Sequence, residues 1–186
     1  MKFKTLCIAI LALSISFTSI ANETNSTDPV KKEVKNDSNK TIVGVAVSNK
    51  NFTTLVAAVK AAGLVDVLSA KGPFTVFAPV NDAFGKLPQG TVSTLLKPEN
   101  KKLLTSILTY HVVAGKFNAK AVVKAIKANK GKFVITTVQG GKLTASLRDG
   151  NVILTDEKGN TSTVIITDVK ASNGIIHAID SVVMPK

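Results

Sequence analysis

Residues 74–84, FTVFAPVNDAF, constrain the fold of this chain more than any other segment. The first four residues are aromatic or β-branched and follow a Gly-Pro pair, a pattern that predicts the start of a buried strand. Pro79 has no N–H to donate to a neighbouring strand, so we expect the chain to leave the sheet there. A helix should follow at once, with Asn81 as its N-terminal cap. Phe77 and Phe84 should pack around the bend, which makes the segment a nucleus for both halves of the chain.

The N-terminus has the pattern of a secretory signal peptide, which we place at residues 1–21. Two lysines precede an apolar run that is too short for a membrane span, and a small-x-small cleavage site ends at Ala21. Residues 22–40 contain only two valines as apolar anchors, so we expect a disordered leader that contributes nothing to the core. One domain should occupy residues 41–186. The single cysteine, Cys7, lies in the predicted signal peptide, which leaves the mature chain without a thiol.

The predicted domain begins with helices and ends with strands. Over residues 51–131 apolar side chains recur at the helical spacing, which places Val67 and Leu103 in the core. Asn118 is expected to cap the last of these helices, and the segment YHVVAG before it is expected to be a strand closed by glycine.

From residue 132 onward the apolar period changes to two, and glycine- and asparagine-rich turns separate the apolar runs. Helices followed by an antiparallel meander indicate the α+β class. The predicted strands are residues 133–138, 143–147, 152–154, 163–169 and 175–183.

His111 and His177 are the only side chains that normally titrate near neutral pH. Both lie in apolar segments, TYHVV and IIHAI, where a buried structural histidine is the favoured interpretation and a ligand or catalytic role is the alternative. His177 and Asp180 are three residues apart on a predicted strand, so their side chains should point to opposite faces. The sequence has no nucleophile beside a base, no metal-ligand spacing and no phosphate-binding glycine loop. We therefore expect neither an enzyme nor a bound cofactor.

Positive charge is concentrated in one part of the predicted domain. Between Lys97 and Lys132 there are nine lysines and a single acid, and Lys120, Lys124 and Lys127 share one outer face of the predicted helix. The segment has no arginine and two aromatic residues, which disfavours nucleic-acid binding. A solvated lysine face is one interpretation, and contact with an anionic polysaccharide or lipid headgroups is the other.

Three segments together resemble the fasciclin-like domain family. FTVFAPVNDAF resembles the first signature box of the family, ILTYHVVAGKF its Tyr-His segment and GIIHAIDSVVMP its closing box. The resemblance implies an α+β fold in which a twisted antiparallel β-wedge or sandwich carries a helical layer. It also implies a non-enzymatic role in adhesion or in association with a cell surface or matrix. Phe77, Pro79, Asn81, Phe84 and His177 lie in the two boxes and are expected to be structural.

The resemblance also suggests where a partner binds. In animal members of the family, integrin contact is assigned to the Tyr-His segment, which corresponds to Tyr110 and His111. A second assigned motif precedes the closing box, and this chain keeps its acid as Asp168 but not most of the rest. We expect a secreted, monomeric, single-domain protein of bacterial type that binds a cell-surface or matrix component. The alternative is an exported carrier that holds a small apolar ligand between the helices and the sheet.

Overall fold

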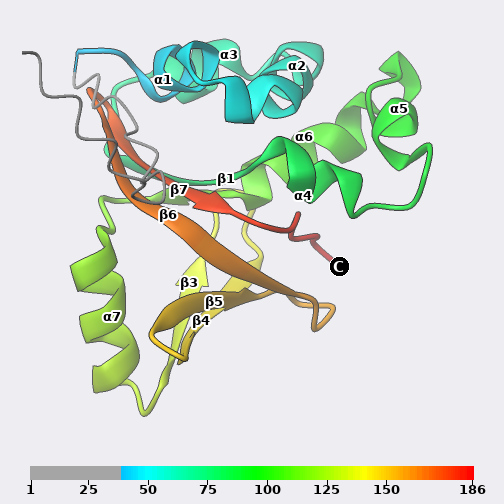
Figure 1. Ribbon diagram of the computed structural model, residues 1–186. Coiled ribbons are helices and arrows are strands. Elements are labelled where there is room, and N and C mark those ends of the chain that lie inside the picture. The colour runs from blue at the N-terminus through cyan, green and yellow to red at the C-terminus, as the bar shows by residue number, and fades with distance from the viewer. Residues whose placement is uncertain (1–38) are drawn as a thin grey trace, which may run out of the picture. The chain divides into compact units, whose positions relative to one another are not determined.

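The computed structural model describes residues 39–186 of the chain. The predicted signal peptide and residues 22–38 of the predicted leader lie outside the described residues. Short helices fill the first half of the described part and most strands lie in the second half, which confirms the predicted α+β class (Figure 1). The helices are α1 (Ile42–Ser48), α2 (Thr53–Ala62), α3 (Val65–Ser69), α4 (Asn81–Gly85), α5 (Thr91–Leu95), α6 (Lys101–Tyr110) and α7 (Ala119–Ala128), with 3-10 turns η1 (Lys50–Phe52) and η2 (Pro98–Asn100). The strands are β1 (Phe74–Pro79), β2 (Val112–Ala114), β3 (Lys132–Thr136), β4 (Lys142–Arg148), β5 (Asn151–Thr155), β6 (Thr161–Ala171) and β7 (Gly174–Ile179).

These strands form one sheet in the order β2-β1-β7-β6-β5-β4-β3. Strands β3 to β7 pair as the antiparallel meander that the turn residues predict. The expectation of a purely antiparallel sheet is wrong, because β1 and β7 are parallel neighbours with Phe77 opposite His177. Parallel partners need a long crossover connection, and the chain between β1 and β7 supplies one that contains four helices and the meander. The first and last sequence motifs of the domain therefore lie side by side (Figure 1).

Strand β1 ends at Pro79, where the sequence predicts that the chain leaves the sheet. The N–H of Val80 donates to the carbonyl of Ile179 on β7 at 3.1 Å. Since successive N–H groups alternate sides along a strand, the nitrogen of Pro79 faces the other neighbour, β2. The pairing of β2 with β1 ends at Val76, so the proline removes no hydrogen bond from the sheet.

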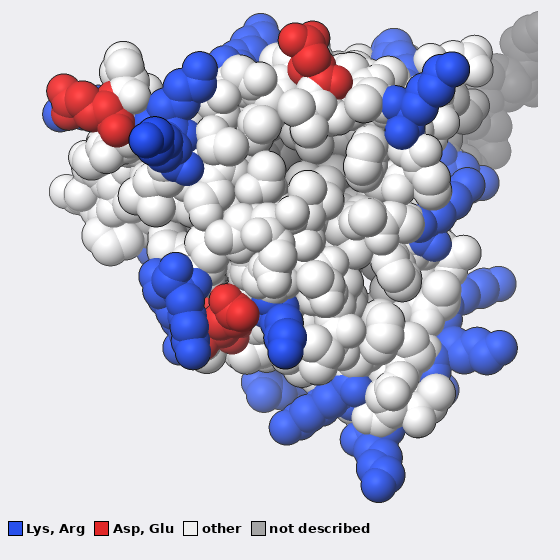
Figure 2. Space-filling model, turned by 180° about the vertical axis from the view of Figure 1, so that it is seen from behind, with Lys and Arg blue, Asp and Glu red and all other residues white. Residues whose placement is uncertain are grey.

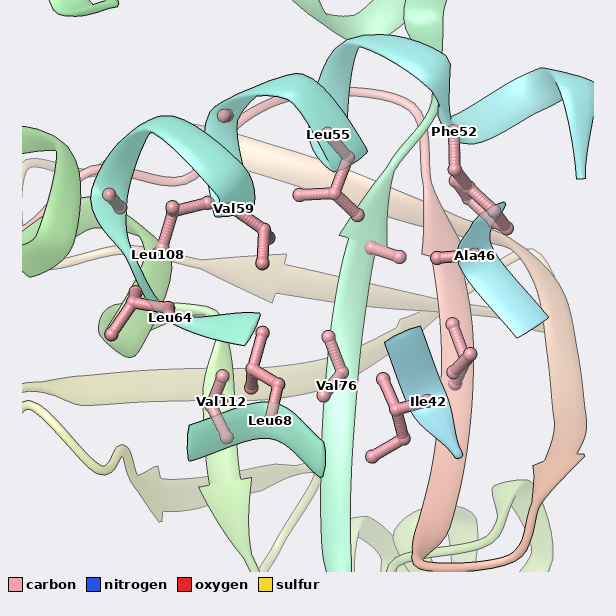
Figure 3. Close-up of a cluster of buried hydrophobic side chains, with 14 of the residues drawn as sticks. Ile42, Ala46, Phe52, Leu55, Val59, Leu64, Leu68, Val76, Leu108 and Val112 are labelled. Atoms are coloured by element: carbon pink, nitrogen blue, oxygen red, sulfur yellow. The ribbon is translucent and has the colours of Figure 1, made fainter. Parts of the chain in front are cut away.

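Side chains of β1 alternate between two apolar clusters. Val76 and Ala78 enter the first cluster, which helices α1, α2, α3 and α6 supply with aliphatic side chains (Figure 3). Phe77 enters the second cluster, which contains residues of α7 and the meander. Phe84 packs against the first cluster, so the two phenylalanines support different cores, and the expectation that both pack around one bend is wrong.

Tertiary packing overrides several local predictions in the helical half. Helix α1, with sequence IVGVAVS, is rich in β-branched residues, yet it forms because Thr41 caps it and one face is buried. Helix α6 continues through Tyr110, and the strand predicted there is reduced to the three residues of β2. Val67 and Leu103 are 50% and 52% exposed, against the prediction that they face the core.

The prediction that Asn81 caps the helix after β1 is wrong. Helix α4 begins at Asn81, its cap residue is Val80, and no side chain caps it. The Asn81 amide reaches helix α2 instead, where Oδ1 accepts hydrogen bonds from the N–H of Thr54 and the hydroxyl of Thr53, both at 3.1 Å. Its Nδ2 donates to the carbonyl of Lys50 at 2.8 Å. Asn81 therefore caps a helix that precedes it by almost thirty residues, and it ties α2 to the end of β1.

We predict that Asn81→Ala lowers the free energy of unfolding by about 1–2 kcal/mol, because it leaves the N–H of Thr54, in the first turn of α2, without a side-chain acceptor. The urea midpoint of the folded domain measures this loss. Asn81→Asp is the matched control. It loses the donor to Lys50 but keeps the acceptor for α2 and places a negative charge at a helix N-terminus, so it should lose less. A midpoint unchanged by Asn81→Ala would show that the bridge to α2 is not formed.

Candidate functional site

Tyr110 lies at the end of α6 and is completely buried, with 0% of its surface exposed. Its hydroxyl donates to the carbonyl of Lys142 at 2.7 Å and accepts from the N–H of Glu157 at 3.3 Å. Burial raises the pKa of Tyr110 to about 12. The ring packs against Gly141, where a β-carbon would lie 2.5 Å from a ring carbon. The side chain therefore joins α6 to the meander.

His111 follows as the C-terminal cap residue of α6 and is 2% exposed. Its Nδ1 lies 2.8 Å from the carbonyl of Ile107, and the N–H of Val183 donates to Nε2 at 3.3 Å. Because the carbonyl can only accept and the N–H can only donate, the ring proton sits on Nδ1. Burial lowers the pKa of His111 to about 4, so the ring is neutral at physiological pH. His111 thus pins the C-terminal segment to α6.

The Tyr-His segment is therefore part of the core of this domain. Its flanking residues Leu108, Val112 and Val113 are buried as well. A partner could touch these side chains only if the domain opened, since burial leaves no surface of Tyr110 for contact. The geometry favours a structural role for both residues over direct recognition.

His177 on β7 is also buried, and it organises the region before α7. Its Nε2 lies 2.7 Å from the carbonyl of Phe117, and the N–H of Asp168 donates to Nδ1 at 3.3 Å. The ring stacks on Phe77 with centroids 5.7 Å apart and an interplanar angle of 26°. Burial lowers the pKa of His177. Asp180 follows the end of β7 and bonds to other partners among the described residues, so it forms no dyad with His177.

Asp168 sits at an irregularity of β6 and serves as a helix cap. Its φ of +58° is left-handed, and the pairing of β6 with β7 shifts register beside it. The carboxylate oxygen Oδ1 accepts from the N–H of Ala119 at 2.9 Å, while Asn118 accepts from the N–H of Ala121 at 2.7 Å. The prediction of Asn118 as a cap is confirmed. Two acceptors from different parts of the chain therefore fix the N-terminus of α7.

Helix α7 presents a basic face made of three of the candidate residues. Lys120, Lys124 and Lys127 are exposed, as the helical spacing predicts, and we refer to them as the α7 lysine face. They line a shallow groove of about 390 Å³ with Ala119 and Val123. Basic side chains project along the edge where α7 lies, at the lower right of Figure 2. Within residues 39–186 none of the three lysines forms an ion pair.

An apolar gap lies where the carrier alternative requires one, between the sheet and helices α1–α3 (Figure 3). Its cavity volume is about 30 Å³, which is room for one water molecule. Ligand pockets usually measure about 300–1,000 Å³. An apolar ligand could enter only if the helices moved away from β1.

Metal-ligand clusters and membrane-spanning helices were sought among the described residues. Residues 39–186 contain no group of three or more His, Cys, Asp or Glu side chains placed to hold a metal. No single helix in this part of the chain is long and apolar enough to cross a membrane. Only a pair, Ile42–Ser48 with Lys50–Ala62, meets the length and composition together, and it is bent by 103°.

A layer of helices on a mixed sheet, whose first strand pairs with its last, defines an α+β domain held together by its two terminal motifs. The family model of the fasciclin domain matches residues 50–185. The chain belongs to the fasciclin domain family.

Relatives from bacteria and animals agree with this assignment. Protein sll1483 of Synechocystis is 52% identical over 163 residues, which cover 88% of this chain and 83% of that protein. The immunogenic protein MPB70 of Mycobacterium bovis is 42% identical over 149 residues, covering 77% of this chain and 68% of that protein. The transforming growth factor-beta-induced protein ig-h3 of Sus scrofa is 35% identical over 150 residues, covering 78% of this chain but only 19% of that protein.

A solved structure shows the same fold. The FAS1 domain pair from the insect cell adhesion molecule Fasciclin I aligns with a TM-score of 0.68 and 21% sequence identity. The match covers 76% of this chain and 50% of that pair. At this identity the likeness concerns the fold alone.

Proposed function

We propose that this protein is a secreted, non-enzymatic module that associates with an anionic cell-surface or matrix polymer through the α7 lysine face. Among the relatives, the cell surface glycolipoprotein MPB83 of Mycobacterium bovis supports an extracellular surface role by its name. MPB83 is 33% identical over 150 residues. The proposal takes the class of function from these relatives and the contact surface from this chain.

The observation that carries the proposal is the contrast in exposure between the two candidate surfaces. Tyr110 and His111 are buried, whereas every member of the α7 lysine face is exposed. A helix rises about 1.5 Å per residue, so the charges at positions 120, 124 and 127 form a row about 10 Å long. Helix α7 contains no acid that would neutralise this row.

A row of lysines on a fixed helix suits a polymer with repeated negative charges. The ammonium group is a compact charge that does not demand the planar geometry of a single ligand. The caps from Asn118 and Asp168 hold α7 in place, so little conformational freedom is lost on contact. An acidic polysaccharide is the partner that we favour. Anionic lipid headgroups are the alternative, and the experiment below tests both.

We predict that Lys120→Glu, Lys124→Glu and Lys127→Glu together abolish retention on a column of immobilised anionic polysaccharide. The triple variant changes the net charge by six units without touching the buried side of α7. Wild-type retention should also fall steeply with added salt, because exposed charges are screened over about 8 Å at physiological ionic strength. Sedimentation with anionic vesicles at the same ionic strength is the lipid arm, and we expect weaker binding there than to the polysaccharide.

The control is a second triple variant with the same change in net charge, Lys60→Glu, Lys102→Glu and Lys158→Glu. These lysines are exposed and lie on α2, on α6 and in the turn before β6. Circular dichroism checks that both variants are folded. If the control loses as much retention as the α7 variant, total charge is responsible and the α7 lysine face is not the contact surface.

A further inference from the structure

A second pocket differs from the α7 groove in composition and in shape. Its volume is about 520 Å³, within the usual range of about 300–1,000 Å³ for small-molecule sites. Residues 69–73, between α3 and β1, form one wall, and residues 171–174, at the turn from β6 to β7, form a second wall. Thr41 and Lys116 complete the lining. None of these residues belongs to the α7 lysine face.

The lining is basic and rich in hydroxyl groups. Lys71 and Lys116 contribute two ammonium groups, and no Asp or Glu lines the pocket. Within residues 39–186 neither lysine forms an ion pair or a side-chain hydrogen bond. Thr41, Ser69 and Ser172 contribute hydroxyl groups. Positive charge without a compensating acid, next to several hydroxyls, suits an anion that also carries hydroxyl groups.

Hydrogen bonds hold the two walls at a fixed separation. The side chain of Asn173 accepts from the N–H of Ile42 at 2.9 Å and donates to the carbonyls of Leu68 and Ala70 at 2.8 and 2.9 Å. Its own carbonyl accepts from the N–H of Phe74 at 3.0 Å. These bonds connect α1, the end of α3, β1 and the β6–β7 turn, so the pocket is formed before any ligand arrives.

A glycine permits the closest approach between these walls. At Gly72 a β-carbon would lie 1.9 Å from the carbonyl oxygen of Asn173, where no side chain fits. The apolar side chains of the lining are short, and they belong to Ala70, Pro73 and Ala171. Such surfaces accommodate the C–H face of a sugar ring but leave no room for a long hydrocarbon chain.

We propose that this pocket binds a small, hydroxyl-rich organic acid of the uronate type. Lys71 and Lys116 supply the positive charge for the carboxylate, and the hydroxyl groups of the lining exchange hydrogen bonds with those of the sugar. The site is independent of the α7 lysine face. The two proposals can therefore fail separately.

The test is a titration of the folded protein, labelled with nitrogen-15, with sodium D-galacturonate at constant ionic strength. Saturable shifts are expected for the amide signals of residues 69–72, Phe74 and residues 171–174. D-galactose, which has the same ring without the carboxylate, should cause much smaller shifts. Equal shifts with the two sugars, or no saturable shift with galacturonate, would overturn the proposal.

Variants then separate the pocket from the general positive field. Lys71→Gln with Lys116→Gln should weaken galacturonate binding about tenfold or more, since each removes a charged donor. Lys102→Gln with Lys158→Gln removes the same charge elsewhere and should leave the affinity within about twofold. All four lysines are exposed, so both variants should fold. The α7 triple variant should keep its galacturonate shifts, and equal weakening by the two double variants would contradict a site at the pocket.

Discussion

Acidification from about pH 7 to about pH 4 is expected to lower the free energy of unfolding by about 3 kcal/mol through His111 alone. Burial lowers the pKa of His111 to about 4, while the unfolded chain should titrate near the ordinary value of 6.5. Above pH 6.5 neither state binds the proton, and stability is unaffected. Between 6.5 and 4 the unfolded state binds the proton and the folded state does not, so stability falls as the pH falls. His177, whose pKa is also lowered, adds to the loss in the same direction.

Urea midpoints across this pH range measure the effect. His111→Gln is the control, because an amide can keep a donor and an acceptor but cannot titrate. The variant should be less stable at pH 7 and should lose much less stability on acidification. If wild type and variant lose stability in parallel, the slope comes from other groups and the neutral, buried His111 is not its source.

Gly174→Ala is expected to cost about 3 kcal/mol or more, or to prevent folding. A β-carbon at Gly174 would lie 2.0 Å from the carbonyl oxygen of Phe74, which is backbone of the parallel partner strand and cannot rotate away. Relieving the overlap would require β1 and β7 to separate at the point where the two terminal motifs of the domain meet. Thermal unfolding followed by circular dichroism measures the loss.

Gly85→Ala is the matched control for the same substitution. No atom lies within 4 Å of a β-carbon at Gly85, which is exposed at the end of α4. Its melting temperature should be unchanged or slightly higher, because alanine reduces the conformational freedom of the unfolded chain. Equal stability of the two variants would show that β1 and β7 do not approach as closely as the structure has them.

Local patterns were sufficient to predict much of the fold. The period-two runs after residue 132 and the glycine turns between them predict every strand of the meander. Asn118 could be recognised as a cap because the helix that it caps begins at the next residue. The outward direction of the α7 lysine face follows from helical spacing alone. Each of these features depends on residues that are close together in sequence.

Features that join distant segments could not be predicted. The parallel pairing of β1 with β7 connects strands about one hundred residues apart, and no local pattern indicates its direction. Asn81 has the residue type and position of a local cap, yet its amide finds better partners in α2. Asp168 fixes α7 only because the irregularity of β6 turns its carboxylate toward Ala119.

At the candidate site, too, features of nearby residues could be predicted and contacts between distant segments could not. The Tyr-His segment could be found in the sequence, but its burial could not, because Tyr110 reaches partners on β4 and at residue 157 that lie far along the chain. The pocket between residues 69–73 and 171–174 gave no signal in the sequence, since its two walls are about one hundred residues apart. The family resemblance pointed to the Tyr-His segment as a contact surface, and charge density pointed to α7.

The proposed function requires that the partner contacts α7 while the Tyr-His segment stays in the core. Hydrogen exchange of the folded protein, alone and with a saturating acidic polysaccharide, tests it most directly. Slower exchange is expected for amides of residues 118–128 in the complex, with unchanged, slow exchange for residues 107–113. Faster exchange at residues 107–113 on binding, with no change in α7, would contradict it and would show that the domain opens to present Tyr110 and His111.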